Sequence, residues 1–144
     1  MTYKTAVCDD SAADRKYLSD LVRQWARSAG HTVTIAEFPS AESFLFHYAE
    51  EKDYDILLLD IEMGNMDGIT MARRLRREND TVQIVFITGY SDYIAEGYEV
   101  DALHYLMKPT GRDKLFSVLD RAAEKLKKNE KVLTLETGGE TIRI

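Results

Sequence analysis

Cysteine is almost absent from this sequence: Cys8 is the only one among 144 residues, so no disulfide can form within the chain. A chain without disulfides fits a reducing compartment. No stretch approaches the roughly 20 apolar residues that a membrane-spanning helix needs, and residues 1–4 do not begin a signal peptide. We therefore expect a soluble cytoplasmic domain with no membrane partner.

Positive charge is also in short supply. Lysine and arginine total 19 against 25 aspartates and glutamates, and the net charge is −6. This balance argues against binding of nucleic acid or of an anionic membrane by this piece of the chain. Hydrophobic residues make up 44% of the sequence, which is enough for a core, and the length is that of one ordinary domain. The composition thus predicts a globular domain rather than a disordered one.

The most informative stretch is Ile56–Asp60, where four aliphatic residues in a row end on a carboxylate. A continuous apolar run of this length is typical of a strand that is buried on both faces, in a parallel sheet covered by helices. Ligands of such sheets bind just beyond the carboxyl ends of the strands. We therefore expect Asp60 at the rim of a sheet, where an acid can take part in chemistry.

Two kinds of apolar pattern alternate along the chain. Short aliphatic and β-branched runs predict five strands, at residues 5–8, 31–38, 56–59, 82–87 and 102–107. Helical spacing predicts five helices: one from the Ser11 N-cap to Gly30, one after Ser40, one around 69–75, a short one over 92–99 and one over 112–128. This alternation predicts a three-layer α/β sandwich, with a doubly wound parallel sheet of order 2-1-3-4-5 as in flavodoxin-like folds.

Residues 129–144 follow a different pattern. We expect a polar linker at 129–131 and then a strand from Val132, where polar and apolar residues alternate. Gly138-Gly139 is a turn signal, and residues 141–144 are again β-like. Because a two-stranded hairpin is barely stable alone, the sequence predicts a first domain over 1–128. Residues 129–144 would be a linker and the first strands of a truncated β-rich domain.

Charged or hydroxyl-bearing residues follow four of the five predicted strands. Asp9 and Asp10 follow the first strand, Asp60 the third, Thr88 the fourth and Lys108 the fifth. The carboxyl ends of parallel strands share one edge, so the order 2-1-3-4-5 makes the three carboxylates converge. Carboxylates in one pocket repel one another unless a cation neutralises them, and Mg²⁺ is the natural ion for such a hard oxygen site.

The same edge holds the groups that phosphoryl chemistry needs. Lys108 adds a compact positive charge, and Thr88 adds a hydroxyl donor for phosphate oxygens. An aspartate can itself be the nucleophile and form an aspartyl phosphate. Each residue alone has an ordinary structural role as a helix cap, a turn residue or a solvated charge. Their coincidence at four strand ends favours a site.

Five short motifs lie in order over residues 4–128: Asp9-Asp10, Leu57-Leu58-Leu59-Asp60, Met66-Asp67-Gly68, Ile87-Thr88 and Lys108-Pro109. In this order and spacing they resemble the receiver domain of bacterial two-component response regulators. The resemblance implies a fold, a chemistry and a set of partners.

By this resemblance Asp60 is the phosphoacceptor, and Asp9, Asp10 and the backbone carbonyl of Glu62 bind Mg²⁺ together with it. Thr88 and Lys108 would bind the phosphoryl oxygens. Tyr105 stands where the family places its switch aromatic, which would move inward as Thr88 is drawn toward the phosphate. The Lys108-Pro109 bond would be cis, as is usual in the family.

Residues 93–109 look like those of receivers that are joined to LytTR-type DNA-binding domains. The resemblance implies a transcription regulator that is phosphorylated by a sensor histidine kinase and forms a homodimer on activation. DNA would be bound through the missing C-terminal domain, not through this chain. Such a chain is not an enzyme in the ordinary sense, because it catalyses only its own phosphorylation and dephosphorylation.

Three features depart from the family pattern or lie outside it. Gly64 stands where many relatives have proline, so we expect a more mobile loop. Gly97 lies within the short fourth helix and costs roughly 1 kcal/mol against alanine there. The basic cluster Arg73–Arg77 is interpreted as a solvated helix face.

Two other protein classes and a non-phosphorylated variant of the same fold share features of this sequence. A phosphatase of the haloacid dehalogenase type also uses an aspartate nucleophile and Mg²⁺, but it needs an aspartate two residues later, where this chain has Glu62. A receiver-like interaction module that no longer takes phosphate is the second alternative. A flavodoxin-type electron carrier ranks last, because no Ser/Thr/Gly-rich phosphate loop follows the first strand.

Overall fold

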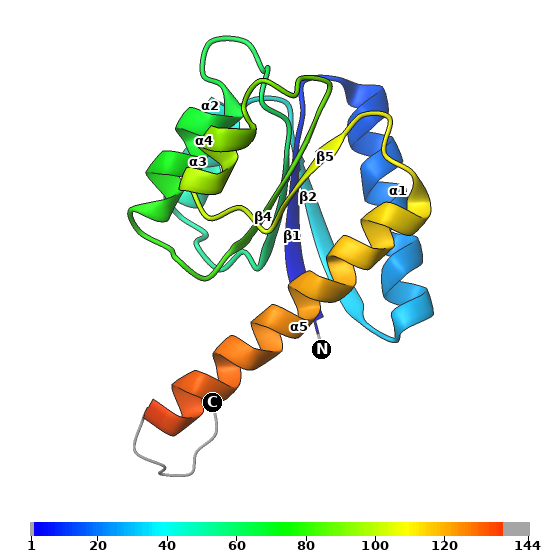
Figure 1. The fold of residues 1–144 in the computed structure, drawn as a ribbon, viewed down its shortest axis with the longest axis vertical. Coiled ribbons are helices and arrows are strands. Elements are labelled where there is room, and N and C mark those ends of the chain that lie inside the picture. Colours follow the sequence, from blue (N-terminus) through cyan, green and yellow to red (C-terminus); the bar gives the residue numbers. More distant parts are fainter. Residues whose placement is uncertain (1, 137–144) are drawn as a thin grey trace.

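The computed structural model describes residues 2–136, with side chains for residues 2–130. Five strands alternate with five helices, as the apolar patterns predict (Figure 1). The elements are β1 (Thr2–Cys8), α1 (Ala12–Ala29), β2 (Thr32–Phe38), α2 (Ala41–Tyr48), β3 (Ile56–Leu59), α3 (Gly68–Arg76), β4 (Gln83–Thr88), α4 (Ile94–Glu99), β5 (His104–Met107) and α5 (Arg112–Glu136). Within residues 2–136, no helix is long and apolar enough to cross a membrane.

The sheet is fully parallel and has the predicted order β2-β1-β3-β4-β5. Its register determines where the strands end. Cys8 of β1 lies beside Leu59 of β3, and Thr88 of β4 lies beside Met107 of β5. The residues that follow these four strands therefore emerge side by side at one edge of the sheet.

Helices cover both faces of the sheet, and each face has its own hydrophobic core. α1 and α5 pack on one face, and α2, α3 and α4 lie on the other (Figure 1). Residues of β3 alternate between the two cores: Ile56 and Leu58 face α1 and α5, whereas Leu57 and Leu59 face α2 and α3. All four are fully buried, and each contributes roughly 1.5–3 kcal/mol by leaving water. This double burial explains why β3 is an unbroken apolar run.

The ends of the helices follow the predicted capping residues. Ser11 accepts a hydrogen bond from the backbone N–H of Asp14 at 3.2 Å, and Ser40 accepts one from Ser43 at 3.0 Å. Gly30 ends α1 with φ 78°, a left-handed conformation that glycine adopts without steric cost. The Ser11 cap fixes the position at which α1 begins, directly after the two aspartates that follow β1.

The C-terminal helix is longer than predicted. α5 continues through Glu136, so the predicted linker at 129–131 and the predicted strand from Val132 are both wrong over these residues. Helix-forming residues dominate this stretch, and the first glycine after Gly111 is Gly138, so nothing interrupts helix propagation before it. The predicted turn and second strand, at residues 137–144, lie outside the described residues. The assignment of 129–144 to a second domain stays a prediction.

Smaller differences occur at other element ends. β1 begins at Thr2 rather than residue 5, α4 begins at Ile94 rather than residue 92, and β5 begins at His104 rather than residue 102. Element ends depend on pairing with neighbours, which a local pattern does not contain.

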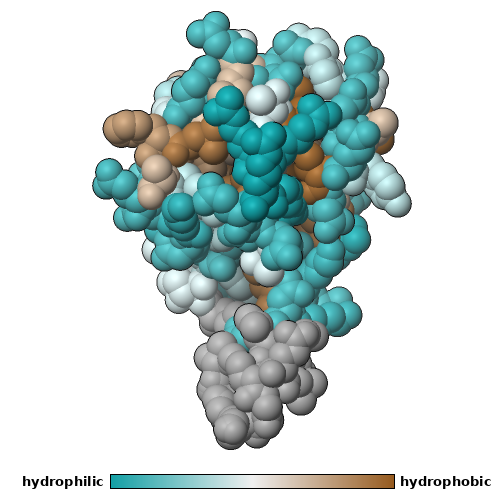
Figure 2. All heavy atoms as spheres, turned by 90° about the vertical axis from the view of Figure 1, so that its left-hand side faces the viewer, coloured by the Kyte–Doolittle hydropathy of each residue, from teal (hydrophilic) through white to brown (hydrophobic). Residues whose placement is uncertain are grey.

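The arginine cluster on α3 is not uniformly solvated. Arg73 and Arg74 are exposed. The side of the molecule on which α2, α3 and α4 lie in Figure 1 is mostly hydrophilic (Figure 2). The Arg76 guanidinium instead donates to the backbone carbonyls of Val82 and Val100, both at 2.7 Å, and to that of Asp101 at 3.0 Å. Burial lowers the pKa of Arg76 below its usual value. Arg76 thus ties α3 to the start of β4 and to the end of α4.

We expect Arg76→Met to lower the free energy of unfolding by about 2–3 kcal/mol, because part-buried carbonyls lose a charged donor. Urea denaturation measures this change. Arg73→Met is the matched control on the same helix. Among the residues whose side chains are described, Arg73 makes only an exposed ion pair with Glu99 at 3.4 Å, so its loss should cost less than about 0.5 kcal/mol. Equal costs for the two variants would contradict the structural role of Arg76.

Candidate functional site

Carboxylates from two neighbouring strands meet at the carboxyl edge of the sheet. Asp9 follows β1 and Asp60 follows β3, and the Asp60 N–H donates to the Cys8 carbonyl at 2.9 Å, which holds these two strand ends together. Asp9 and Asp60 are buried, with 1% and 7% of their surface exposed, while Asp10 is exposed. Carboxylate oxygens of the three aspartates all lie within 4.8 Å of one another. Sequence reasoning expected this convergence from the strand order.

Asp60 is held in an environment that disfavours its charge. Its Oδ1 accepts a hydrogen bond from the backbone N–H of Ile61 at 2.8 Å. Burial, followed by the negative charge of Asp9, raises the pKa of Asp60 above the ordinary aspartate value, and Lys108 and the Thr88 hydroxyl only partly offset this. The site therefore has more negative charge than its single ammonium neutralises. A hard divalent cation would relieve the repulsion, and three carboxylates are suitable ligands for one.

Lys108 brings the positive charge. Its backbone N–H donates to the Thr88 carbonyl at 2.8 Å, which aligns the end of β5 with that of β4, and the Lys108-Pro109 peptide is cis. The ammonium contacts carboxylate oxygens of Asp9 at 2.8 Å, Asp14 at 2.8 Å and Asp60 at 3.3 Å. Burial alone would lower the pKa of Lys108, but the hydrogen bonds to Asp14 and Asp9 and the charge of Asp60 raise it. Lys108 is therefore charged at neutral pH.

Asp14 is a site residue that sequence reasoning missed. Its backbone N–H does belong to the Ser11 cap of α1, but its side chain turns to Lys108, 94 residues away along the chain. One signal was present in the sequence. An acidic residue in the first turn of the helix that follows an acidic strand end lies near the same edge of the sheet.

An open cavity of about 450 Å³ lies over the carboxylates. Its walls include Asp60, Lys108, Asp14 of α1 and residues of the loops after β1, β3 and β4, namely Asp10, Ser11, Glu62, Gly64, Gly89 and Tyr90. Thr88 is fully buried at the end of β4. The cavity is large enough for a phosphoryl group beside a cation, and its only wall residue with a positive charge is Lys108.

Glu62 lines this cavity, but its side chain turns toward α4. The Tyr93 hydroxyl donates to Glu62 Oε2 at 2.8 Å, and this bond raises the pKa of Tyr93 to about 12. Tyr93 immediately precedes α4. The contact links the loop after β3 to the helix after β4, and the sequence pattern did not reveal it.

Tyr105 belongs to β5, and its ring lies against Phe86 of β4 and faces Gly97 of α4. Its ring packs on Phe86 with a centroid distance of 5.9 Å, and its hydroxyl donates to the carbonyl of Tyr90, two residues after Thr88. Gly97 of α4 makes room for this packing, because a Cβ there would lie 3.2 Å from the Tyr105 ring and 3.4 Å from the Phe86 ring. The helix cost of Gly97 is therefore offset by packing. Tyr105 is coupled to the segment that begins at Thr88.

Gly68 brings the start of α3 against the backbone of Asp60. The Gly68 N–H donates to the Ile61 carbonyl at 2.8 Å, and Asp67 caps α3 by accepting from the Thr70 N–H at 2.8 Å. A Cβ on Gly68 would lie 2.1 Å from the carbonyl oxygen of Asp60. Only glycine permits this approach, which supports the loop that carries Asp60.

Comparison with known proteins identifies relatives of the chain. A family model described as response regulator receiver domain matches residues 6–120. An uncharacterised response regulatory protein of Vibrio cholerae is 30% identical over 129 residues, covering 89% of this chain and 48% of that protein. The sensory transduction protein LytT of Bacillus subtilis is 30% identical over 118 residues, covering 82% and 47%. The chain thus spans about half the length of these curated relatives.

Solved structures share the fold. The receiver domain of AraT, a response regulator from Geobacillus stearothermophilus, superposes with a TM-score of 0.77 at 26% identity and covers 90% of this chain and 98% of that one. The response regulatory domain of the Klebsiella pneumoniae protein MrkE has a TM-score of 0.78 at 21% identity, covering 87% and 98%. The second likeness concerns the fold alone.

Proposed function

This chain belongs to the response regulator receiver domain family, and on that premise we propose that Asp60 accepts a phosphoryl group from a sensor histidine kinase. One observation carries the proposal: buried Asp60 lies with two other carboxylates and the Lys108 ammonium at the floor of an open cavity. A lone buried carboxylate would be an ordinary structural acid. A carboxylate with a matched cluster of charges and room for a phosphate is equipped for transfer chemistry.

Each group has a role in the proposed reaction. Asp9, Asp10, Asp60 and the backbone carbonyl of Glu62 would hold Mg²⁺, which would neutralise charge on the phosphoryl oxygens. A carboxylate oxygen of Asp60 attacks the phosphorus, and the bond from phosphorus to the donor's nitrogen or oxygen breaks, so the donor leaves with the electron pair. Lys108 and the Thr88 hydroxyl then bind oxygens of the aspartyl phosphate. Positioning and charge neutralisation lower the barrier.

The conformational effect of phosphorylation would be transmitted from Asp60 to the surface through Thr88 and Tyr105. Movement of Thr88 toward the phosphate displaces the segment that includes Tyr90, whose carbonyl accepts the Tyr105 hydroxyl bond. Loss of that bond would free the Tyr105 ring, which already packs on Phe86 beside Gly97, to move further inward. The position of the Tyr105 ring would thus change together with the positions of α4 and β5.

The intact protein would be a transcription regulator of the LytTR type. Its relative in Bacillus subtilis is a sensory transduction protein named LytT, and a further relative there is the transcriptional regulatory protein NatR, 28% identical over 122 residues. The net charge of −6 fits DNA binding by another part of the protein rather than by this chain. A homodimer of activated chains would bring two DNA-binding domains together.

Incubation with acetyl phosphate tests the proposed chemistry. With Mg²⁺ present, the intact mass should rise by one phosphoryl group, and removal of divalent ions with EDTA should prevent the rise, because the acidic cluster then repels the phosphate. An unchanged mass in the presence of Mg²⁺ would contradict the proposal. It would favour the alternative of a receiver-like interaction module that does not accept phosphate.

The phosphatase alternative predicts a different result in the same assay. Steady turnover of an external phosphoester such as p-nitrophenyl phosphate would identify an enzyme. We expect none, because the chain should catalyse only its own phosphorylation and dephosphorylation.

A further inference from the structure

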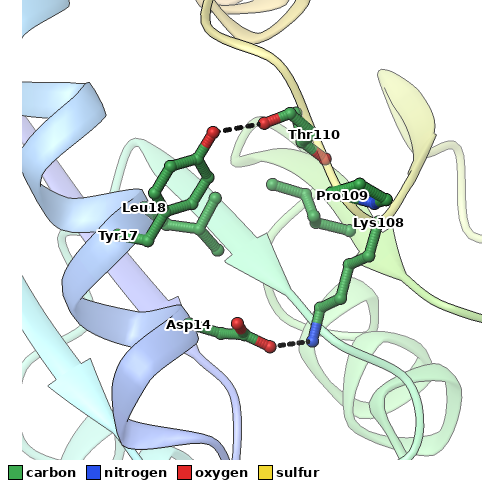
Figure 3. A pocket seen from close by; sticks show the side chains of 7 residues that line it. Asp14, Tyr17, Leu18, Lys108, Pro109 and Thr110 are labelled. Carbon is green, nitrogen blue, oxygen red and sulfur yellow. Dashed lines mark hydrogen bonds and ion pairs between the residues drawn. The ribbon is translucent and has the colours of Figure 1, made fainter.

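The ion pair between Asp14 and Lys108 stands between two cavities. Both side chains line the 450 Å³ cavity over Asp60, and both also line a second cavity of about 340 Å³. The second cavity lies between α1 and the loop after β5, with Tyr17, Leu18, Ile87, Pro109 and Thr110 as its other walls. In Figure 3 the Lys108 side chain extends from the loop after β5 toward α1, where its ammonium meets the Asp14 carboxylate.

α1 holds the Lys108 loop at two points. Asp14 contacts the Lys108 ammonium at 2.8 Å, and one turn later the Tyr17 hydroxyl donates to the backbone carbonyl of Thr110 at 2.7 Å (Figure 3). The first contact fixes the end of the lysine side chain, and the second fixes the backbone just beyond it. Lys108 is therefore positioned by α1 as well as by the acids of the sheet.

The three carboxylates around Lys108 are not equivalent. Asp9 and Asp60 belong to the proposed cation site, so a bound cation and the ammonium compete for their oxygens. Asp14 is outside that cluster, its side chain is 44% exposed, and its contact with Lys108 is 0.5 Å shorter than that of Asp60, at 2.8 Å against 3.3 Å. Asp14 is the one of the three partners that can keep the ammonium when a cation occupies the other two.

We propose that Asp14 is a positioning residue, which draws the Lys108 ammonium toward α1 and so leaves Asp9 and Asp60 free to bind the divalent cation. This inference rests on the proposed function of the site. The same contact keeps the ammonium at the cavity wall, within reach of a phosphoryl oxygen on Asp60. Without Asp14, the ammonium remains on Asp9 and Asp60 and occupies the place of the cation.

A double-mutant cycle separates this role from a simple loss of charge. The probe is Mg²⁺ alone, and its Kd is measured from the backbone amide NMR shifts of the whole chain. We expect Asp14→Asn to raise the Kd roughly fivefold, within the range for coupled charged neighbours. Asp14→Glu keeps the charge and should stay within about twofold of the unmodified chain. Asp20→Asn is the matched control, because Asp20 also lies on α1 and, within the described part of the chain, pairs only with the exposed Lys16 and Arg23.

The second arm of the cycle uses Lys108→Met, which keeps the side-chain length and removes the ammonium. In that background Asp14→Asn should change the Kd no more than Asp20→Asn does, because no lysine remains to be positioned. An equal effect of Asp14→Asn with and without Lys108 would overturn the proposal, as would an effect equal to that of Asp20→Asn in the original chain.

The proposal and the function can fail separately. If the chain accepts phosphate but shows no coupling between Asp14 and Lys108, the proposed function is supported and the positioning role of Asp14 is contradicted. If the Mg²⁺ titration shows the coupling but no phosphate is accepted, the positioning role of Asp14 is supported and the proposed function is contradicted.

Discussion

Asp60→Asn should abolish phosphate incorporation from acetyl phosphate. The amide of asparagine is not a nucleophile, and the substitution also removes one of the three negative side chains at the cation site. The change is nearly isosteric, and Ile61 N–H can still donate to the side-chain oxygen, so the fold should persist. Intact-mass spectrometry after incubation with Mg²⁺ and acetyl phosphate measures the effect.

Asp20→Asn is the control for this substitution. It makes the same chemical change at a half-exposed side chain of α1 that does not line the cavity, and it should leave phosphate incorporation unchanged. If Asp60→Asn still gained a phosphoryl group, Asp60 would not be the acceptor. The exposed Asp10 would then be the first residue to test.

Gly68→Ala should damage both stability and phosphate transfer. Helix propensity favours alanine by about 1 kcal/mol in the first turn of α3. The clash is larger, because the new Cβ would meet the Asp60 carbonyl oxygen at 2.1 Å and the Ile61 Cα at 3.1 Å. We expect a net loss of about 3 kcal/mol in the free energy of unfolding. The shifted Asp60 backbone should slow phosphorylation roughly tenfold to a hundredfold, because small misplacements of a reacting group are costly.

Urea denaturation and the rate of mass increase measure these two effects. Gly89→Ala is the control for stability: Gly89 also lines the cavity, but an added Cβ there meets no atom within 4 Å. It should change stability by less than about 0.5 kcal/mol. If the Gly68→Ala chain is as stable and as rapidly phosphorylated as the unmodified chain, the loop after β3 can shift to accommodate the new Cβ without misplacing Asp60. That result would contradict the account of Gly68.

The parallel sheet and its acidic edge were predicted from the apolar patterns of the sequence and from the strand order that these patterns indicate. β3 is apolar at every position because helices cover both faces, so its sequence alone indicates a parallel sheet. Once β1 and β3 are neighbours, Asp9 and Asp60 must emerge together. The convergence is a consequence of topology, and topology follows from the alternation of strands and helices.

Contacts between distant side chains were beyond that reasoning. Asp14 pairs with Lys108 across 94 residues and Tyr93 with Glu62 across 31. Neither residue has a pattern of its own that names its partner. Arg76 cannot be told from its exposed arginine neighbours in the sequence. The carbonyls that accept its hydrogen bonds, those of Val82 and Val100, are brought to its guanidinium only by the tertiary fold.

The end of α5 was mispredicted for a different reason. The residues from 132 to 136 alternate as a strand would, and the whole stretch from 129 to 136 is also free of glycine and proline. A helix that is already formed extends at little cost through such residues, because nucleation has been completed upstream. Continuity with α5 therefore outweighs the alternating pattern.

Localisation of the phosphoryl group is the most direct test of the account. Borohydride reduces an aspartyl phosphate to homoserine, which marks the acceptor position permanently, and tandem mass spectrometry of the digested chain then identifies it. The account predicts a single reduced position, at residue 60, that appears only when Mg²⁺ and acetyl phosphate have both been present. Reduction at another aspartate, or at none, would contradict it.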